Sequence, residues 1–267
     1  MTTIQKLLDL KGRRAFITGA SGVLGRMMAN TLAELGADLV LVDLPGTELS
    51  ELSESLDERW GVKSKYFYCN LEEQQQRKEL LEWYKNNFDG LNILINNAAF
   101  IGASDLKGWS VPFEEQTVDT WRRALEVNIT SVFELCKELT PILRLSEGAN
   151  IINIASIYGK YGPDWRLYEN TSMSNPAAYS ASKGGVIQLT RWLATTIAPE
   201  VRVNAISPGG VFRNQPKEFM QRYESRTPLA RMATEDDFRG VIAYLSTDMS
   251  GYVTGQNIEV DGGWGVW

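Results

Sequence analysis

Tyr179 and Lys183, four residues apart, are the pair in this sequence with the clearest capacity for chemistry. On a helix, residues at this spacing project from one face, about one turn apart. A tyrosine phenol has an unperturbed pKa of about 10, and a nearby ammonium group lowers that pKa because it favours the phenolate. The pair can therefore exchange a proton with a substrate hydroxyl or carbonyl group. The alternative reading of the same spacing is a packed tyrosine beside a solvated lysine.

Glycines follow the first predicted strand in the stretch Thr18-Gly-Ala-Ser-Gly-Val-Leu-Gly25, which leads directly into a predicted helix. In this context Gly19 permits a tight turn, Gly22 lets a pyrophosphate approach the backbone, and Gly25 packs the helix against the sheet. The free N–H groups at the start of a helix attract phosphate. The stretch therefore predicts a dinucleotide-binding turn.

Three further polar residues follow predicted strands or interrupt a predicted helix. Asp43 ends the second strand, where an acid accepts hydrogen bonds from ribose hydroxyls and repels a 2′-phosphate, so it favours NAD over NADP. Ser156 follows the fifth strand, at the edge where ligands bind in open parallel sheets. Asn128 is a poor helix former inside a helical stretch, which indicates a specific role.

The composition excludes several classes of protein. The 267 residues contain no histidine, which rules out a Ser-His-Asp triad and an HExxH zinc site, and no metal site is predicted. The net charge of −6, without a basic cluster, argues against a nucleic-acid partner. No apolar run is long enough to cross a membrane and no signal peptide is evident, so a cytoplasmic protein is expected. Cys69 and Cys136 are expected to be buried free thiols.

Strand and helix patterns alternate along the chain, which predicts one α/β domain over residues 1–267, with a doubly wound, mostly parallel sheet. Short apolar runs predict strands at 14–18, 39–42, 65–69, 93–95, 150–155, 202–206 and 256–260. Amphipathic patterns predict helices at about 24–35, 47–60, 72–87, 117–145, 178–194 and 234–245.

Taken together, these motifs resemble the short-chain dehydrogenase/reductase family over nearly the whole chain, from about Lys11 to Gly263. The resemblance rests on the glycine stretch and Asp43, and further on Asn96-Asn97-Ala98-Ala99, Asn128, Ser156, Tyr179, Lys183, Asn204, Pro208-Gly209 and Asp261-Gly262-Gly263. It implies a Rossmann-like fold, a nicotinamide cofactor, a small-molecule substrate and a homo-oligomer of two or four copies.

The resemblance also implies a role for each matching residue. Tyr179 would be the general acid/base, and Lys183 would bind the nicotinamide ribose and lower the tyrosine pKa. Ser156 would orient the substrate oxygen, and Asn128 would hold a water molecule that relays protons to Lys183. Besides Tyr179 and Lys183, the implied cofactor contacts are Gly19, Ser21, Gly22, Val23, Leu24, Asp43, Asn70, Leu71, Asn97, Ala98, Pro208, Gly209 and Val211.

The chain departs from the family pattern at three of these motifs. The middle glycine, Gly22, comes one residue earlier than in the shorter members and resembles the longer, sugar-nucleotide-modifying ones. Asn70 replaces an aspartate that usually meets the adenine. Arg213 stands where a threonine often contacts the carboxamide.

The largest departure is the separation of Ser156 and Tyr179, which exceeds the usual one by about ten residues. The intervening segment, 157–177, is rich in aromatic and hydrogen-bonding side chains and is expected to cover a polyhydroxylated substrate such as a sugar. Packing on a neighbouring subunit is the alternative. Residues 210–233 are expected to form the opposite wall, where cations within 213–223 would meet a phosphate. Both segments resemble those of family members found with bacterial surface-sugar biosynthesis.

Three functional hypotheses follow. The first is an NAD-dependent oxidoreductase that interconverts a secondary alcohol and a ketone, with Tyr179 exchanging the proton. The second is a sugar epimerase or dehydratase that recycles its NAD, which the Gly22 spacing favours but the lack of a separate substrate domain opposes. The third is a non-catalytic NAD-binding scaffold.

Overall fold

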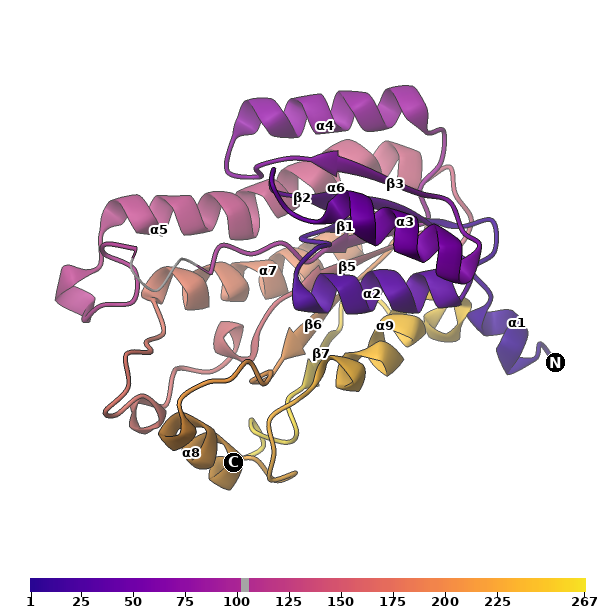
Figure 1. Ribbon diagram of the computed structural model, residues 1–267. Helices are drawn as coiled ribbons and strands as arrows, with labels where there is room; N and C mark the ends of the chain where they lie inside the picture. Colours follow the sequence, from indigo (N-terminus) through magenta and orange to yellow (C-terminus); the bar gives the residue numbers. More distant parts are fainter. Residues whose placement is uncertain (102–105) are drawn as a thin grey trace.

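The computed structural model describes residues 1–101 and 106–267. A single seven-stranded sheet runs through the molecule in the order β3-β2-β1-β4-β5-β6-β7 (Figure 1). Every neighbouring pair of strands in it is parallel. The strands are β1 (Arg14–Thr18), β2 (Asp38–Asp43), β3 (Ser64–Tyr68), β4 (Ile93–Asn96), β5 (Asn150–Ile154), β6 (Arg202–Pro208) and β7 (Asn257–Val260).

Helices connect the strands and cover both faces of the sheet. The α-helices are α1 (Ile4–Leu8), α2 (Val23–Glu34), α3 (Leu49–Trp60), α4 (Gln74–Asn87), α5 (Val118–Leu125), α6 (Ser131–Leu143), α7 (Ala177–Thr196), α8 (Lys217–Arg226) and α9 (Arg239–Ser246). A π-helical turn, η2 (Glu126–Thr130), joins α5 to α6. The 3₁₀ turns are η1 (Phe113–Glu115), η3 (Ile157–Gly159), η4 (Trp165–Leu167), η5 (Glu235–Phe238) and η6 (Asp248–Ser250).

Two apolar layers hold the helices on the sheet. On one face, α2, α3 and α9 pack through residues such as Met28, Leu52 and Ile242. On the other face, α4, α6 and α7 pack through residues such as Leu80 and Leu139. Burial of each apolar side chain contributes about 1.5–3 kcal/mol, so these layers are the main source of stability. The doubly wound parallel fold expected from the strand–helix alternation is confirmed.

The predicted elements agree with the structure except in four places. The helix expected over 117–145 contains the π turn η2, and the one expected over 234–245 begins as the 3₁₀ turn η5, with Thr234 and Asp237 forming a capping box. Helix α8 was not predicted, although Phe219 and Tyr223 have the spacing of one helix face and both are buried. The short α1 was also not predicted. Cys69 and Cys136 are buried free thiols, as expected.

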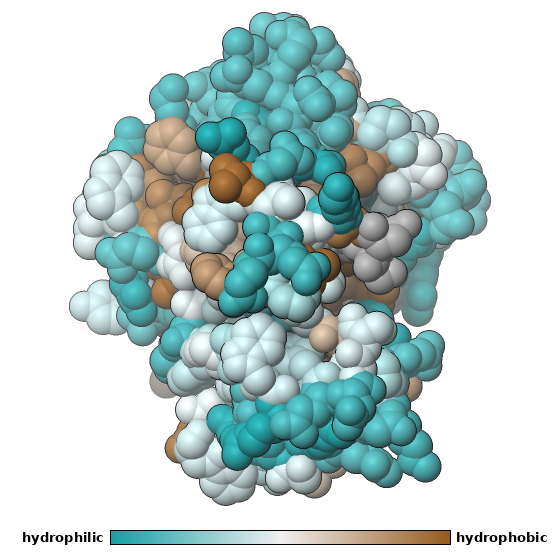
Figure 2. Space-filling view, turned by 90° about the vertical axis from the view of Figure 1, so that its left-hand side faces the viewer, coloured by the Kyte–Doolittle hydropathy of each residue, from teal (hydrophilic) through white to brown (hydrophobic). Residues whose placement is uncertain are grey.

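A third apolar cluster lies beyond the carboxyl edge of the sheet, where α8 and the C-terminus come together (Figure 1). The space-filling view shows this region as a smaller lobe below the main body (Figure 2). Its aromatic side chains come from segment 157–177, from α8 and from the C-terminal tail, where Trp264 is buried. Tyr223 stacks on Trp264 with ring centroids 6.3 Å apart. The lobe therefore joins three segments that are distant in sequence.

No helix within residues 1–101 and 106–267 combines the length and the apolar character that crossing a bilayer requires.

Gly159 allows η3 to lie directly against α7. A Cβ atom at this position would stand 2.6 Å from the carbonyl carbon of Lys183, which is closer than real Cβ contacts. The atoms in the way belong to the backbone of α7 rather than to the end of a flexible side chain, so a larger residue would force η3 or α7 to shift as a whole. Glycine at position 159 therefore sets the distance between the segment after Ser156 and the helix that carries Tyr179.

We expect Gly159→Ala to lower the free energy of unfolding by more than about 1 kcal/mol, because the added methyl group forces η3 away from α7. Gly162→Ala is the matched control, since a Cβ there meets no atom within 4 Å. Urea denaturation of both variants tests the expectation. Equal stability of the two variants would contradict the proposed close contact.

Candidate active site

The residues singled out in the sequence gather at the carboxyl edge of the sheet. Gly19 follows β1, Asp43 ends β2, Asn97 follows β4, and Ser156 follows β5 by two residues. Pro208 ends β6 at the same edge. Because all the strands are parallel, these side chains stand around one crevice, at the place where open α/β sheets bind ligands.

A groove of about 600 Å³ opens above β1, β2 and β4. Ten of the predicted cofactor contacts line it, namely Gly19, Ser21, Gly22, Val23, Leu24, Asp43, Asn70, Leu71, Asn97 and Ala98. Ile101 and Arg123, which were not predicted, also line it, and so does Arg213, which stands where a threonine of the family often contacts the carboxamide. Arg123 forms an ion pair with Glu72 and lies over the ring of Phe100, an arrangement that the sequence spacing does not indicate.

The glycine stretch has the geometry of a phosphate-binding turn. Gly22 is the N-cap of α2 and makes no side-chain capping bond, so the first N–H groups of the helix remain open to the groove. A Cβ atom on Gly25 would lie 2.0 Å from the carbonyl oxygen of Gly19, so only glycine allows α2 to start so close to the turn. The turn, with its free N–H groups and the helix dipole, fits a pyrophosphate.

Asp43 holds the glycine stretch from the end of β2. Its carboxylate accepts hydrogen bonds from the backbone N–H of Ser21 at 2.8 Å and from the Ser21 hydroxyl at 2.5 Å. From the other side, the amide of Asn97 donates to the carbonyl oxygens of Thr18 and Gly19 at 3.0 and 2.9 Å. These bonds fix the turn between two strands before any ligand binds. The whole groove thus fits a nicotinamide dinucleotide.

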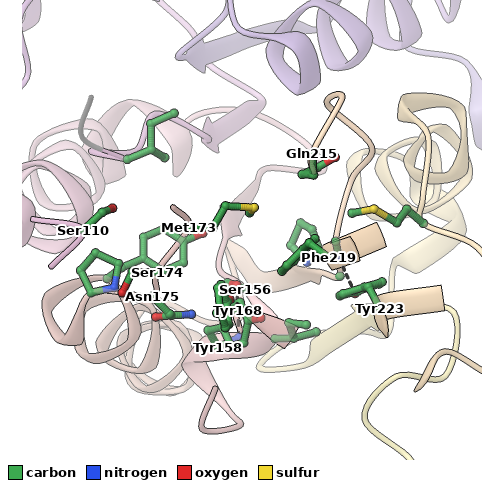
Figure 3. Close-up of a pocket in the computed structure, with 18 of the residues that line it drawn as sticks. Ser110, Ser156, Tyr158, Tyr168, Met173, Ser174, Asn175, Gln215, Phe219 and Tyr223 are labelled. Carbon is green, nitrogen blue, oxygen red and sulfur yellow. Dashed lines mark hydrogen bonds between the residues drawn. The ribbon is translucent and has the colours of Figure 1, made fainter. Parts of the chain in front are cut away.

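A second cavity, of about 270 Å³, adjoins the groove, and Ile101 lines both. Ser156 and Tyr179 are among its lining residues, and so are Pro208 and Gly209, which the family resemblance placed at the cofactor. Segment 157–177 provides one wall, and residues 210–233 provide the opposite wall, with Gln215, Phe219 and Tyr223 facing across (Figure 3). The cavity is therefore a compartment for a small molecule beside the dinucleotide groove.

Lys183 is buried beneath this cavity. Its Nζ donates a hydrogen bond of 2.7 Å to the carbonyl oxygen of Ile154, the last residue of β5, and lies 5.8 Å from the ring centroid of Tyr179. Burial lowers the pKa of Lys183 from its ordinary value of 10.5 to about 8. The ammonium group and Tyr179 thus lie on one face of α7, as the spacing predicted.

The pKa of Tyr179 differs from the expectation. Burial raises it above the ordinary value of 10, while the neighbouring Ser156 hydroxyl acts in the opposite direction and Tyr168 adds to the increase. Desolvation of the phenolate is the largest cause, and Lys183 is not among the groups that shift this pKa, because its ammonium group donates to the carbonyl oxygen of Ile154 instead. The Ser156 hydroxyl is the group that favours ionisation of Tyr179.

Asn128 lies in the π turn η2, a deformation that occurs often at functional sites. Its Oδ1 accepts a hydrogen bond from the backbone N–H of Phe100 at 2.6 Å, and its Nδ2 donates to the hydroxyl of Ser182 at 3.0 Å. Ser182 precedes Lys183 in α7. Asn128 therefore connects the loop after β4 with the helix of Tyr179, and its role in a proton relay stays a prediction.

Some predicted residues lie outside both cavities or have other partners. Asn128, Lys183 and Val211 line neither cavity, and Val211 instead forms a β-bridge with Ala233. Two of the three cations within 213–223, which were expected to meet a phosphate, are bound by the protein itself. Arg213 pairs with Glu235 at 2.8 Å, and Arg222 donates to the carbonyl oxygen of Glu169.

The fold, the dinucleotide groove and the Ser156–Tyr179–Lys183 arrangement define a class of nicotinamide-dependent oxidoreductases. A family model described as "Enoyl-(Acyl carrier protein) reductase" matches residues 19–265. The chain belongs to the short-chain dehydrogenase/reductase family.

Known relatives and solved structures agree with this family. The chain is 35% identical over 266 residues to nodulation protein G of Rhizobium sp. (strain N33), with 96% of this chain and 98% of the relative covered. It is similar to NADPH-dependent 3-quinuclidinone reductase of Rhodotorula rubra, with a TM-score of 0.86 and 26% identity over 100% and 96% of the two chains. NAD⁺-bound xylitol dehydrogenase gives a TM-score of 0.83 and 28% identity, covering 95% and 99%.

Proposed function

We propose that the protein is an NAD-dependent oxidoreductase that interconverts a secondary alcohol and a ketone on a sugar or another polyhydroxylated small molecule. The observation that supports this most directly is the position of Tyr179. Its side chain lines the small cavity next to the dinucleotide groove, with Ser156 beside it and Lys183 beneath it. Hydroxyl, phenol and ammonium groups in this order suit proton exchange at a carbinol oxygen.

The dinucleotide, when bound, accepts or supplies the hydride. Ser156 lines the cavity, and its hydroxyl oxygen accepts a hydrogen bond from the backbone N–H of Tyr158 at 3.2 Å. The hydroxyl proton of Ser156 is therefore available to bind the reacting oxygen. Tyr179 exchanges the proton of that oxygen. Lys183 keeps a positive charge below Tyr179 and, through Ile154, fixes α7 against the end of β5. Asn128 is proposed to hold the water molecule of the relay.

The choice of NAD rests on Asp43. Its carboxylate lines the groove at the end of β2, where it would accept hydrogen bonds from the adenosine ribose and repel a 2′-phosphate. The similar proteins include both an NADPH-dependent and an NAD⁺-bound enzyme, so similarity to known structures supports either cofactor equally. Arg123 and Arg213 line the same groove, but both form ion pairs with glutamates.

The substrate class rests on the cavity walls. Segments 157–177 and 210–233 are proposed to cover a bound substrate, because they provide hydroxyl and amide groups together with aromatic faces. One of the similar structures is a xylitol dehydrogenase, which adds support for a polyol. Aromatic faces combined with a few polar groups are typical of small-molecule sites.

The enzyme is further proposed to be a homo-oligomer of two or four copies, because Phe133 on α6 and Trp192 on α7 leave about half of their side chains exposed. Light scattering after size-exclusion chromatography should give two or four times the mass of one chain. Trp192→Glu should lower that mass. A single-chain mass for the unaltered protein would refute the oligomer.

We expect Tyr179→Phe to lower kcat with NAD and a secondary alcohol by about 10²–10⁴-fold, because the variant loses the group that exchanges the proton. Calorimetry should show that NAD still binds, since the tyrosine lines the neighbouring cavity rather than the groove. Full turnover by this variant on a proven substrate would refute the mechanism. The same assay separates the alternatives: an epimerase or dehydratase forms no net NADH, and a scaffold binds NAD without turnover.

We expect Asp43→Ala to reduce the preference for NAD over NADP by about tenfold or more, because hydrogen bonds to a charged group contribute about 1.5–3 kcal/mol. Asp38→Ala is the matched control: it lies at the opposite end of β2 and accepts from the N–H of Lys63, away from the groove. Calorimetric titration with both dinucleotides provides the measurement. Tighter binding of NADP by the unaltered protein would overturn the assignment.

A further inference from the structure

Two tyrosines of the segment between Ser156 and Tyr179 meet in the substrate cavity. Tyr158 belongs to η3, Tyr168 follows η4, and their hydroxyl groups are 2.7 Å apart. Both line the cavity together with Ser156, and Figure 3 shows the three side chains close to one another. The pair forms no part of the proton exchange proposed above.

The hydrogen bond between the two tyrosines leaves one proton free. Tyr168 donates to the oxygen of Tyr158, so the hydroxyl of Tyr158 must give its own proton to another acceptor. Within residues 1–101 and 106–267, no hydrogen bond donated by this hydroxyl is found. Polar groups in a buried setting are normally paired, and here the cavity is the space left for the missing acceptor.

Tyr158 is fixed relative to the reacting oxygen. Its backbone N–H donates to the Oγ of Ser156 at 3.2 Å, so the tyrosine keeps a constant position beside the serine. Its ring packs edge-on against the buried Trp264, with centroids 6.1 Å apart. Burial and the neighbouring phenols of Tyr168 and Tyr179 raise the pKa of Tyr158, which keeps it protonated and therefore a donor.

We propose that Tyr158, oriented by Tyr168, donates a hydrogen bond to a second substrate oxygen on the carbon next to the reacting carbon. The substrate would then be a vicinal diol, or the corresponding α-hydroxy ketone. This inference rests on the proposed function, in which Ser156 and Tyr179 hold the first oxygen. The hydroxyl groups of Ser156 and Tyr158 are two neighbouring donors in the cavity, and they match two oxygens on adjacent carbons. Phe219, Met173 and Met232 supply the apolar wall for the rest of the ring or chain.

The experiment compares matched substrates that differ in one hydroxyl group: cyclohexanol with cis- and trans-cyclohexane-1,2-diol, and butan-2-ol with butane-2,3-diol. The unaltered enzyme with NAD should show a higher kcat/KM for the diol of each set. Tyr158→Phe should lower the diol-to-alcohol ratio of kcat/KM by about three- to tenfold, the effect of one hydrogen bond. Tyr168→Phe should lower the ratio in the same direction, because Tyr158 loses its orienting partner.

Tyr161→Phe is the matched control. This tyrosine belongs to the same segment but bonds to Glu259 at 2.8 Å and does not line the cavity, so the ratio should stay within about twofold. An equal loss on diol and mono-alcohol in Tyr158→Phe would reveal a merely structural role and overturn the proposal. Diols that are no better than mono-alcohols for the unaltered enzyme would also overturn it. Absence of turnover with every alcohol would instead refute the proposed function.

Discussion

The hydrogen bond between Lys183 and the carbonyl oxygen of Ile154 is the contact on which the arrangement of the site depends. It fixes α7, which carries Tyr179, against the end of β5, and Ser156 follows β5 by two residues. The close contact at Gly159 packs η3, the turn directly after Ser156, against the same helix α7. Because the bond is buried, water competes with it little, so the relative position of serine and tyrosine is set by the fold itself.

The substrate cavity depends on a different kind of contact, namely aromatic packing outside the sheet. Segment 157–177, α8 and the C-terminal tail have no strand to hold them, and they cover one another through Tyr158, Tyr223 and Trp264. The dinucleotide groove, in contrast, is built on strand ends and on hydrogen bonds to the glycine stretch. The molecule thus combines a half built on strand ends, for the cofactor common to the family, with a half built from loops and α8, and loops are the segments that vary most between related proteins.

Much of this could be predicted from the sequence, for physical reasons that differ between elements. Apolar runs bounded by glycines predicted the strands, and residues at their carboxyl ends predicted the groove, because parallel strands end at one edge. The Tyr158–Tyr168 pair could not be predicted, since it joins two turns whose path depends on Trp264 in the distant tail. Nor could the raised pKa of Tyr179: the spacing indicated an ammonium group nearby, but burial depends on the packing of the whole lobe.

The burial of Lys183 links the stability of the fold to protons. In the folded chain this lysine has a pKa of about 8, whereas in an unfolded chain it has its ordinary pKa of about 10.5. Between these two pH values the unfolded state holds a proton that the folded state has released, so this residue makes unfolding less favourable as pH rises. At neutral pH both states are protonated, and the fold bears the full cost of a buried cation. The lysine that organises the site thus lowers the free energy of unfolding at neutral pH.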